Sequence, residues 1–249
     1  FAAQLSPANT TMHRGEQLIH QVEEVLAITG KQKLNLIGHS HGGPTVLYVA
    51  ATQPQYIASI TGVAGTYHGS KVADDIQNNS LTRTAFNILG DYIIGPLIAL
   101  GQFKPELEID FDASMKSLTQ TGSNTFNATV AQQVIKDGVL ASTENCNKNL
   151  KQKDSKGIHY YSWTGVAQAT NALDIDTVLM QLGPLSYGSK DNDGMVSRCS
   201  AFMGKVIHDQ YKLNHTDLAN MMFGLKGVFA PDPVALYRQH ANRLKLEGL

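Results

Sequence analysis

A serine set between glycines is the residue of this sequence best placed to do covalent chemistry. Residues 38–42 read Gly-His-Ser-His-Gly and fit the pattern G-x-S-x-G. Where a strand turns sharply into a helix, this pattern exposes the serine hydroxyl, here that of Ser40, above a sheet. The N–H of His41 would then face a developing oxyanion. The chemistry that these residues predict is nucleophilic attack on a carbonyl carbon.

A serine hydroxyl is a weak nucleophile and needs a base, which a histidine supplies most often. In proteins with a serine of this kind, an acidic residue and then the histidine follow the serine along the chain. Four of the nine histidines precede the serine or flank it too closely to reach its hydroxyl: His13, His20, His39 and His41. Of the later ones, His215 is favoured, because residues 214–217 read Asn-His-Thr-Asp and form a polar loop before a helix. His208, expected in or near a loop, and His240, on the last helix, are weaker alternatives.

The acid has two pairs of candidates. Asp191 and Asp193 lie in a turn sequence that ends in glycine, and Asp174 and Asp176 lie in Leu-Asp-Ile-Asp. Aspartates are common in turns and helix caps for purely structural reasons. Spacing alone does not choose among the four.

The elements around the serine alternate as in a parallel sheet covered by helices. A period of 3.6 residues indicates helices, and short apolar runs between turn residues indicate buried parallel strands. Proline at residue 44 suits the first turn of a helix. The expected helices cover 14–28, 42–52 and 233–245, and the expected strands 34–37, 57–63 and 158–164.

Length and composition exclude several classes of protein. A chain of 249 residues with 42% hydrophobic residues is a globular protein, and its length favours one α/β domain. A net charge of −1 argues against a nucleic-acid partner. The 12 uncharged residues between Asp91 and Lys104 are too few to cross a bilayer, which takes about 20, so no transmembrane segment is expected.

The segment from about 80 to 122 is strongly apolar and interrupted by glycines. It fits either kinked core helices or a mobile cover that closes over a site. The two cysteines, Cys146 and Cys199, are too far apart in sequence for a zinc site. They fit either two unrelated thiols or one disulfide of a secreted protein.

The chain resembles the secreted, foldase-dependent true lipases of Gram-negative bacteria, known as family I. The matching stretches keep their order and span nearly the whole chain. They are residues 14–18, 34–45, 48–51, 160–163, 192–194, 214–215 with 217, 223–225 and 237–245.

This resemblance implies an α/β-hydrolase fold and hydrolysis of long-chain triacylglycerols at an oil–water interface. It implies Ser40 as nucleophile, His215 as general base and Asp193 as the acid that orients the base, with the N–H of His41 in the oxyanion hole. It also implies that the 80–122 segment contains a lid. A carboxylesterase acting on short soluble esters and an inactive lipid-binding fragment are the alternatives.

The resemblance further implies one structural Ca²⁺. The carboxylates of Asp174 and Asp217 and the backbone carbonyls of Met221 and Leu225 would be its ligands. Ca²⁺ is a hard cation that takes such oxygens.

Finally, the resemblance implies that Cys146 pairs with Cys199, that the protein is secreted, and that a dedicated foldase chaperone is a partner. Family members carry an N-terminal strand ending in His-Gly before the position of Arg14. Residues 1–12 contain no such strand. We therefore expect residues 1–249 to form one α/β-hydrolase domain that lacks this strand, as a partial copy of a longer lipase.

Overall fold

Within the part of the chain that the structure describes, four parallel strands form the sheet on which the rest of the fold is built. They are β1 (Leu34–His39), β2 (Ile57–Val63), β3 (His159–Gly165) and β4 (Lys205–Tyr211), side by side in sequence order. Each neighbouring pair runs parallel, so the carboxyl ends of all four strands lie at one edge of the sheet. The computed structural model describes every residue except 81–82, 85–106, 172–175 and 222–223.

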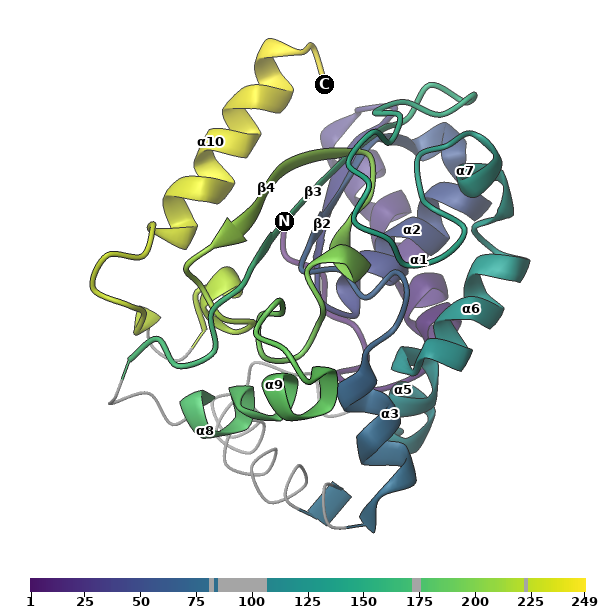
Figure 1. Cartoon of the computed structure of the whole chain (residues 1–249). Coiled ribbons are helices and arrows are strands. Elements are labelled where there is room, and N and C mark those ends of the chain that lie inside the picture. Colours follow the sequence, from purple (N-terminus) through teal and green to yellow (C-terminus); the bar gives the residue numbers. More distant parts are fainter. Residues whose placement is uncertain (81–82, 85–106, 172–175, 222–223) are drawn as a thin grey trace.

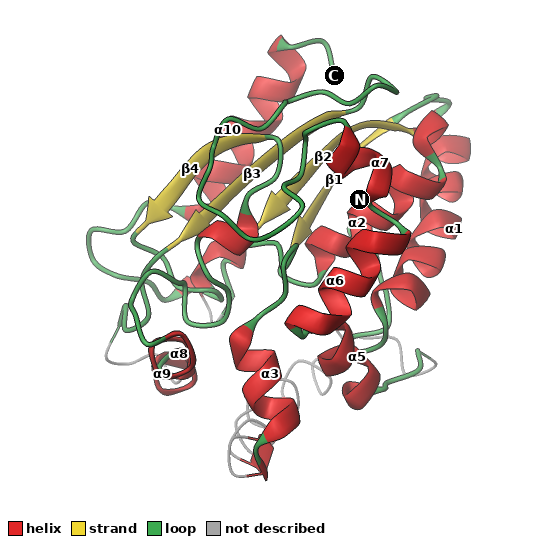
Figure 2. Ribbon diagram, turned by 45° about the vertical axis from the view of Figure 1, so that its right-hand side comes forward, coloured by secondary structure: helices red, strands yellow, loops and turns green. Residues whose placement is uncertain are grey.

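Helices cover both faces of this sheet (Figures 1 and 2). On one face lie α1 (Thr11–Thr29), α2 (Gly42–Thr52) and α7 (Gln132–Lys136), which bury the larger apolar core against β1 and β2. On the other face α10 (Pro233–Leu246) packs beside β3. The α/β-hydrolase fold predicted from the sequence is thereby confirmed in its parallel sheet and two helical layers.

Helix α1 shows how local sequence sets the ends of an element. It begins three residues before the predicted start, because the side chain of Thr10 accepts a hydrogen bond from the N–H of His13 and caps the helix. It ends at Gly30, which adopts φ 66°. Its apolar residues Leu18 and Val22 are buried, as the periodicity predicts.

The sheet is less uniformly buried than the sequence predicts. Strand β2 is buried along almost its whole length, whereas exposure alternates along β1 and Ile37 is 39% exposed. The expectation of a fully buried strand at 34–37 is therefore wrong. The reason is position, since β1 pairs with one strand only, β2, among the described residues.

The remaining elements lie between and beyond the strands. Three of them, α3 (Lys71–Asn78), α5 (Phe111–Leu118) and α6 (Gln120–Thr129), follow β2. The others are η1 (Pro54–Tyr56), α8 (Asp176–Met180), α9 (Leu182–Tyr187), η2 (Cys199–Ala201) and η3 (Asp217–Ala219). Most of the apolar stretch expected to contain a lid, residues 85–106, lies outside the described residues. Among the residues that are described, no helix combines the length and apolar character needed to cross a membrane.

Candidate active site

Ser40 occupies the turn between β1 and α2, at the carboxyl edge of the sheet. Its φ is 55°, a left-handed conformation that is costly for a residue with a side chain. Close packing holds the turn. A Cβ on Gly38 would lie 2.1 Å from the carbonyl oxygen of Gly42, and a Cβ on Gly43 would lie 2.8 Å from Gly65 Cα. Gly42 itself faces open space, so steric need explains only one of the two glycines of the motif.

A hydrogen-bonded chain leads from this serine through His215 to Asp193. His215 Nε2 lies 2.8 Å from Ser40 Oγ, and His215 Nδ1 lies 2.8 Å from Asp193 Oδ2. Because the carboxylate only accepts, Nδ1 carries the hydrogen and Nε2 is left to accept from the serine hydroxyl. Asp193 is fully buried, and its other oxygen accepts from the N–H groups of Met195 and Val196, at 3.0 and 2.8 Å.

The other acids proposed from the sequence have other partners. Asp191 forms an ion pair with Arg198, at 2.6 Å. Asp176 is fully buried and accepts hydrogen bonds from Thr216 and Asn214. Asp174 lies outside the described residues.

The alternative bases also lie elsewhere. His208 is an exposed residue within β4 and packs on Tyr211, so its expected place in or near a loop is wrong. His240 is 1% exposed, and its Nε2 lies 2.7 Å from Thr61 Oγ1. Burial lowers its pKa to about 4.

Two histidines of the motif take positions that the sequence does not reveal. The His41 ring turns inward, with Nε2 2.8 Å from Thr11 Oγ1 and Nδ1 3.4 Å from Ser114 Oγ. It joins the elbow to α1 and α5, and burial lowers its pKa well below the usual value. His39 lies against His215, with Nε2 2.8 Å from the carbonyl oxygen of His215. Burial, together with the neighbouring His215, lowers the pKa of His39 to about 3.

Ser40 and His215 open into a pocket that is mostly apolar. It lies between the elbow, α3, α5 and the loop after Asp193. Besides the serine and histidine, its walls are Thr66, Ser70, Ala73, Ile76, Met115, Leu118, Met195 and Val196. Such a wall suits a hydrocarbon chain next to the serine hydroxyl.

The loop that carries His215 also carries the carboxylate expected to bind calcium. Asp217 is 2% exposed and lies at the start of η3, and Met221 and Leu225 follow on the same loop. Three of the four expected ligands are thus described, and all offer oxygen atoms, which suit Ca²⁺. The structure leaves the fourth, Asp174, undescribed.

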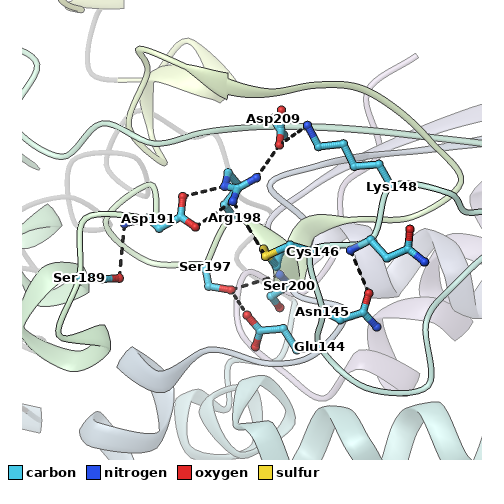
Figure 3. The surroundings of a disulfide bond; sticks show 12 residues. Glu144, Asn145, Cys146, Lys148, Ser189, Asp191, Ser197, Arg198, Ser200 and Asp209 are labelled. Atoms are coloured by element: carbon cyan, nitrogen blue, oxygen red, sulfur yellow. Dashed lines mark hydrogen bonds and ion pairs between the residues drawn. A yellow bond between two sulfur atoms is a disulfide. The ribbon is translucent and has the colours of Figure 1, made fainter.

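Cys146 and Cys199 are joined in a disulfide, as the resemblance implies (Figure 3). Their sulfurs lie near Asp191, but a disulfide sulfur is not a thiolate ligand, so the three do not make a metal site. Arg198, next to Cys199, binds both Asp191 and Asp209, the latter at 2.7 Å. The disulfide and these ion pairs fasten the segment that carries Asp193.

At the carboxyl edge of the parallel sheet, the serine of a strand-to-helix elbow is hydrogen-bonded to a histidine, and that histidine is hydrogen-bonded to a buried aspartate. This arrangement defines an α/β-type serine hydrolase. A family model described as the alpha/beta hydrolase fold matches residues 6–198. Solved structures agree on the fold. The lipase of Staphylococcus hyicus has a TM-score of 0.55 at 16% identity, over 98% of this chain and 84% of that one. Lipase 1 from Pelosinus fermentans has a TM-score of 0.55 at 15% identity, over 98% and 88%.

Relatives of higher sequence identity show which family of α/β hydrolases this is. A triacylglycerol lipase of Vibrio cholerae serotype O1 is 43% identical over 100% of this chain and 78% of its own length. A triacylglycerol lipase of Pseudomonas fragi is 34% identical, over 100% of this chain and 85% of its own length. The chain belongs to the triacylglycerol lipase family of α/β hydrolases.

Proposed function

We propose that this protein is a triacylglycerol lipase that hydrolyses long-chain acylglycerol esters through Ser40, His215 and Asp193. The observation that carries the proposal is the pair of 2.8 Å contacts that links the three side chains at the elbow. The apolar pocket beside Ser40 and the names of the relatives support an acylglycerol as substrate.

In the proposed reaction Ser40 Oγ attacks the ester carbonyl carbon while His215 Nε2 takes its proton. The C–O bond to glycerol then breaks, the leaving alkoxide receives that proton, and an acyl-enzyme remains. Water activated by the same nitrogen adds to the acyl carbon and releases the fatty acid and the free serine. Buried Asp193 holds the imidazole in the tautomer that this sequence of steps needs and stabilises the imidazolium.

The N–H of His41 is our proposed donor to the oxyanion. It belongs to the residue that directly precedes α2, where backbone N–H groups have no partner within the helix. With its ring fixed by Thr11, the backbone of His41 is held before substrate arrives, which is what makes such donors effective.

We further propose one structural Ca²⁺ on Asp174, Asp217 and the carbonyls of Met221 and Leu225. When bound, the ion would supply a fixed positive charge that holds the loop carrying His215. It would not contact the substrate, so its expected effect is on stability.

The disulfide supports secretion, because such bonds persist in oxidising compartments. It closes a loop with a sequence separation of 53, which stabilises the fold by about 4 kcal/mol in the chain-entropy model. Dependence on a foldase remains part of this proposal and rests on the family resemblance. A refolding assay with and without the chaperone would test it.

The proposal is tested by comparing emulsified triolein with dissolved p-nitrophenyl butyrate as substrates. We expect hydrolysis of both, covalent labelling of Ser40 by an alkyl phosphonate, and loss of label and activity in Ser40→Ala. Hydrolysis of the dissolved ester alone would instead identify a carboxylesterase. Binding of triolein without any hydrolysis would identify a lipid-binding protein.

A further inference from the structure

Ser70, at the start of α3, makes a hydrogen bond that the capping of a helix does not explain. It is the N-cap of α3, and its Oγ accepts from the N–H groups of Val72 and Ala73, at 3.1 and 3.4 Å. The same hydroxyl donates to the carbonyl oxygen of Met195 at 2.5 Å. Because capping uses only the lone pairs of a hydroxyl, its hydrogen is left for this second contact.

Met195 is one of the two residues whose N–H groups hold the acid of the proposed triad. Its N–H donates to Asp193 Oδ1 at 3.0 Å, while Asp193 Oδ2 lies 2.8 Å from His215 Nδ1. The carbonyl of Met195 is fixed by Ser70, and the N–H of Met195 fixes the carboxylate of Asp193. A chain of hydrogen bonds therefore leads from the first turn of α3 to the histidine.

The backbone around Ser70 is itself held from several sides. The N–H of Ser70 donates to the carbonyl oxygen of Leu118 at 2.9 Å. Gly69 has φ 78°, and a Cβ there would lie 2.6 Å from the carbonyl oxygen of Thr119. Ser200 Oγ, from η2, donates to the carbonyl oxygen of Gly69 at 2.9 Å. A side chain can position another group only if it is locked in this way.

Tyr187 of α9 supports the same contact more weakly. Helix α9 lies beside α3 (Figure 1), and the Tyr187 hydroxyl accepts from the N–H of Lys71 at 3.1 Å. The hydroxyl oxygen lies 3.4 Å from the Met195 carbonyl oxygen, which is long for a hydrogen bond between two oxygens. Among the described residues, Ser70 is therefore the main donor to this carbonyl.

We propose that Ser70 is a positioning residue for ester hydrolysis, whose hydroxyl fixes Met195 and thereby holds Asp193 in line with His215. This inference rests on the proposed function, because it requires that Asp193 orients the base. Ser70 and Met195 both line the pocket beside Ser40, so the same bond joins α3 to the loop of the acid within the pocket wall. In this role Ser70 acts through Met195 and not on the ester.

The first test separates this contact from helix capping. Glycine is an N-cap almost as good as serine but has no hydroxyl, so Ser70→Gly should keep a melting temperature close to that of the wild type. We expect its kcat on dissolved p-nitrophenyl butyrate to fall about tenfold with little change in KM, because one buried hydrogen bond that orients the acid is lost. Ser70→Thr, which keeps the hydroxyl, should recover most of kcat. The matched control is Asp232→Gly, which removes the capping side chain of α10 and should leave kcat unchanged.

The second test does not depend on turnover. The proton between His215 Nδ1 and Asp193 Oδ2 should give a proton NMR resonance far downfield of the backbone amides, which His215→Gln would remove. We expect this resonance at the same position in the wild type and in Asp232→Gly. In Ser70→Gly it should move upfield or disappear through faster exchange with water, because the carboxylate is held less firmly.

Ser70→Gly with the kcat and the resonance of Asp232→Gly would overturn the proposal and leave Ser70 as a helix cap only. Equal losses of kcat in Ser70→Thr and Ser70→Gly would also overturn it, because the hydroxyl would then not be the group that matters. If Ser70→Gly does not fold, Ser70→Asp replaces it with the same expectations, since an aspartate caps a helix but has no hydrogen to donate.

Failure of the proposed function would look different. Asp193→Asn would then keep full turnover of dissolved ester. If only the role of Ser70 is wrong, Asp193→Asn loses its activity and Ser70→Gly keeps it.

Discussion

The ring of His39 lies against the ring of His215, with centroids 4.7 Å apart, and its Nε2 is 2.8 Å from the His215 carbonyl oxygen. A carbonyl oxygen only accepts, so Nε2 carries a hydrogen and donates it. This contact ties the elbow that carries Ser40 to the loop that carries the proposed base. Because the pKa of His39 is lowered to about 3, its ring stays neutral and does not repel an imidazolium on His215.

We expect His39→Leu to lower kcat about tenfold on dissolved ester with little change in KM, since one buried hydrogen bond contributes about 1–3 kcal/mol when a partner is left unpaired. His39→Gln, which can still donate, should recover much of this loss. Above pH 4 the pH profiles of His39→Gln and wild type should have the same shape, because His39 does not titrate there. Unchanged kcat in His39→Leu would refute the positioning role.

Asp193→Asn should lower kcat on dissolved ester by about 10⁴, because an amide favours the wrong tautomer of the histidine. The matched control is Asp191→Asn, two residues away, which loses its ion pair with Arg198. We expect that control to keep activity within about threefold, since a partly exposed ion pair contributes about 0–1 kcal/mol. Equal losses in the two variants would show that the whole turn, and not one carboxylate, supports His215.

The proposed calcium site predicts that a chelator lowers the melting temperature. A ligand that binds only the folded state stabilises it by RT ln(1 + [L]/Kd), so a chelator removes that contribution. Asp217→Asn should have a lower melting temperature than the wild type, and a chelator should not lower it further. The melting temperature of Asp232→Asn, which alters only the cap of α10, should still fall when the chelator is added. Elemental analysis that finds no bound calcium, with melting indifferent to chelator, would exclude the site.

Acid should destabilise the fold through His240. Its Nδ1 lies 2.9 Å from Arg243 Nη1, which donates, and burial and Arg243 lower its pKa to about 4, against a weaker opposing effect of Glu247. Below about pH 6.5 this histidine binds a proton in the unfolded chain but stays neutral in the folded chain. The free energy of unfolding therefore falls as the pH falls from about 6.5 toward 4.

Melting curves at pH 7.5 and 4.5 test this. The melting temperature of His240→Gln should fall less from pH 7.5 to pH 4.5 than that of the wild type. For His208→Gln, an exposed position in β4, the fall should equal that of the wild type. An unaltered loss in His240→Gln would place the acid sensitivity elsewhere, for example at buried His68, whose pKa is also lowered to about 4.

Much of the fold could be predicted because its cause is local. The strand at 57–63 and the helix at 42–52 have the predicted bounds, since apolar runs and periodicity are properties of neighbouring residues. The sequence does not predict strand β4. Its positions are mostly exposed or half-buried, because among the described residues it pairs with β3 alone, and so it lacks an apolar run.

The site could be predicted only in part, because its contacts join distant residues. The motif singled out Ser40, but choosing between Asp191 and Asp193 needed a resemblance, since spacing says nothing of which carboxylate meets His215. The sequence indicates only that His39 is too close to reach the Ser40 hydroxyl. Its actual partner, the carbonyl of His215, is 176 residues away and has no signature in local sequence.

The strands stand in the sheet in the order in which they occur in the chain, and this has a consequence for folding. Ser40 follows the first of these strands and His215 follows the fourth, 175 positions further along the chain. Contacts of such long range form slowly, since a large loop must close before they add stability. The elbow therefore acquires its proposed base only after β3 and β4 have docked. The ability to cleave esters then appears in one late step of folding and not gradually as the sheet grows.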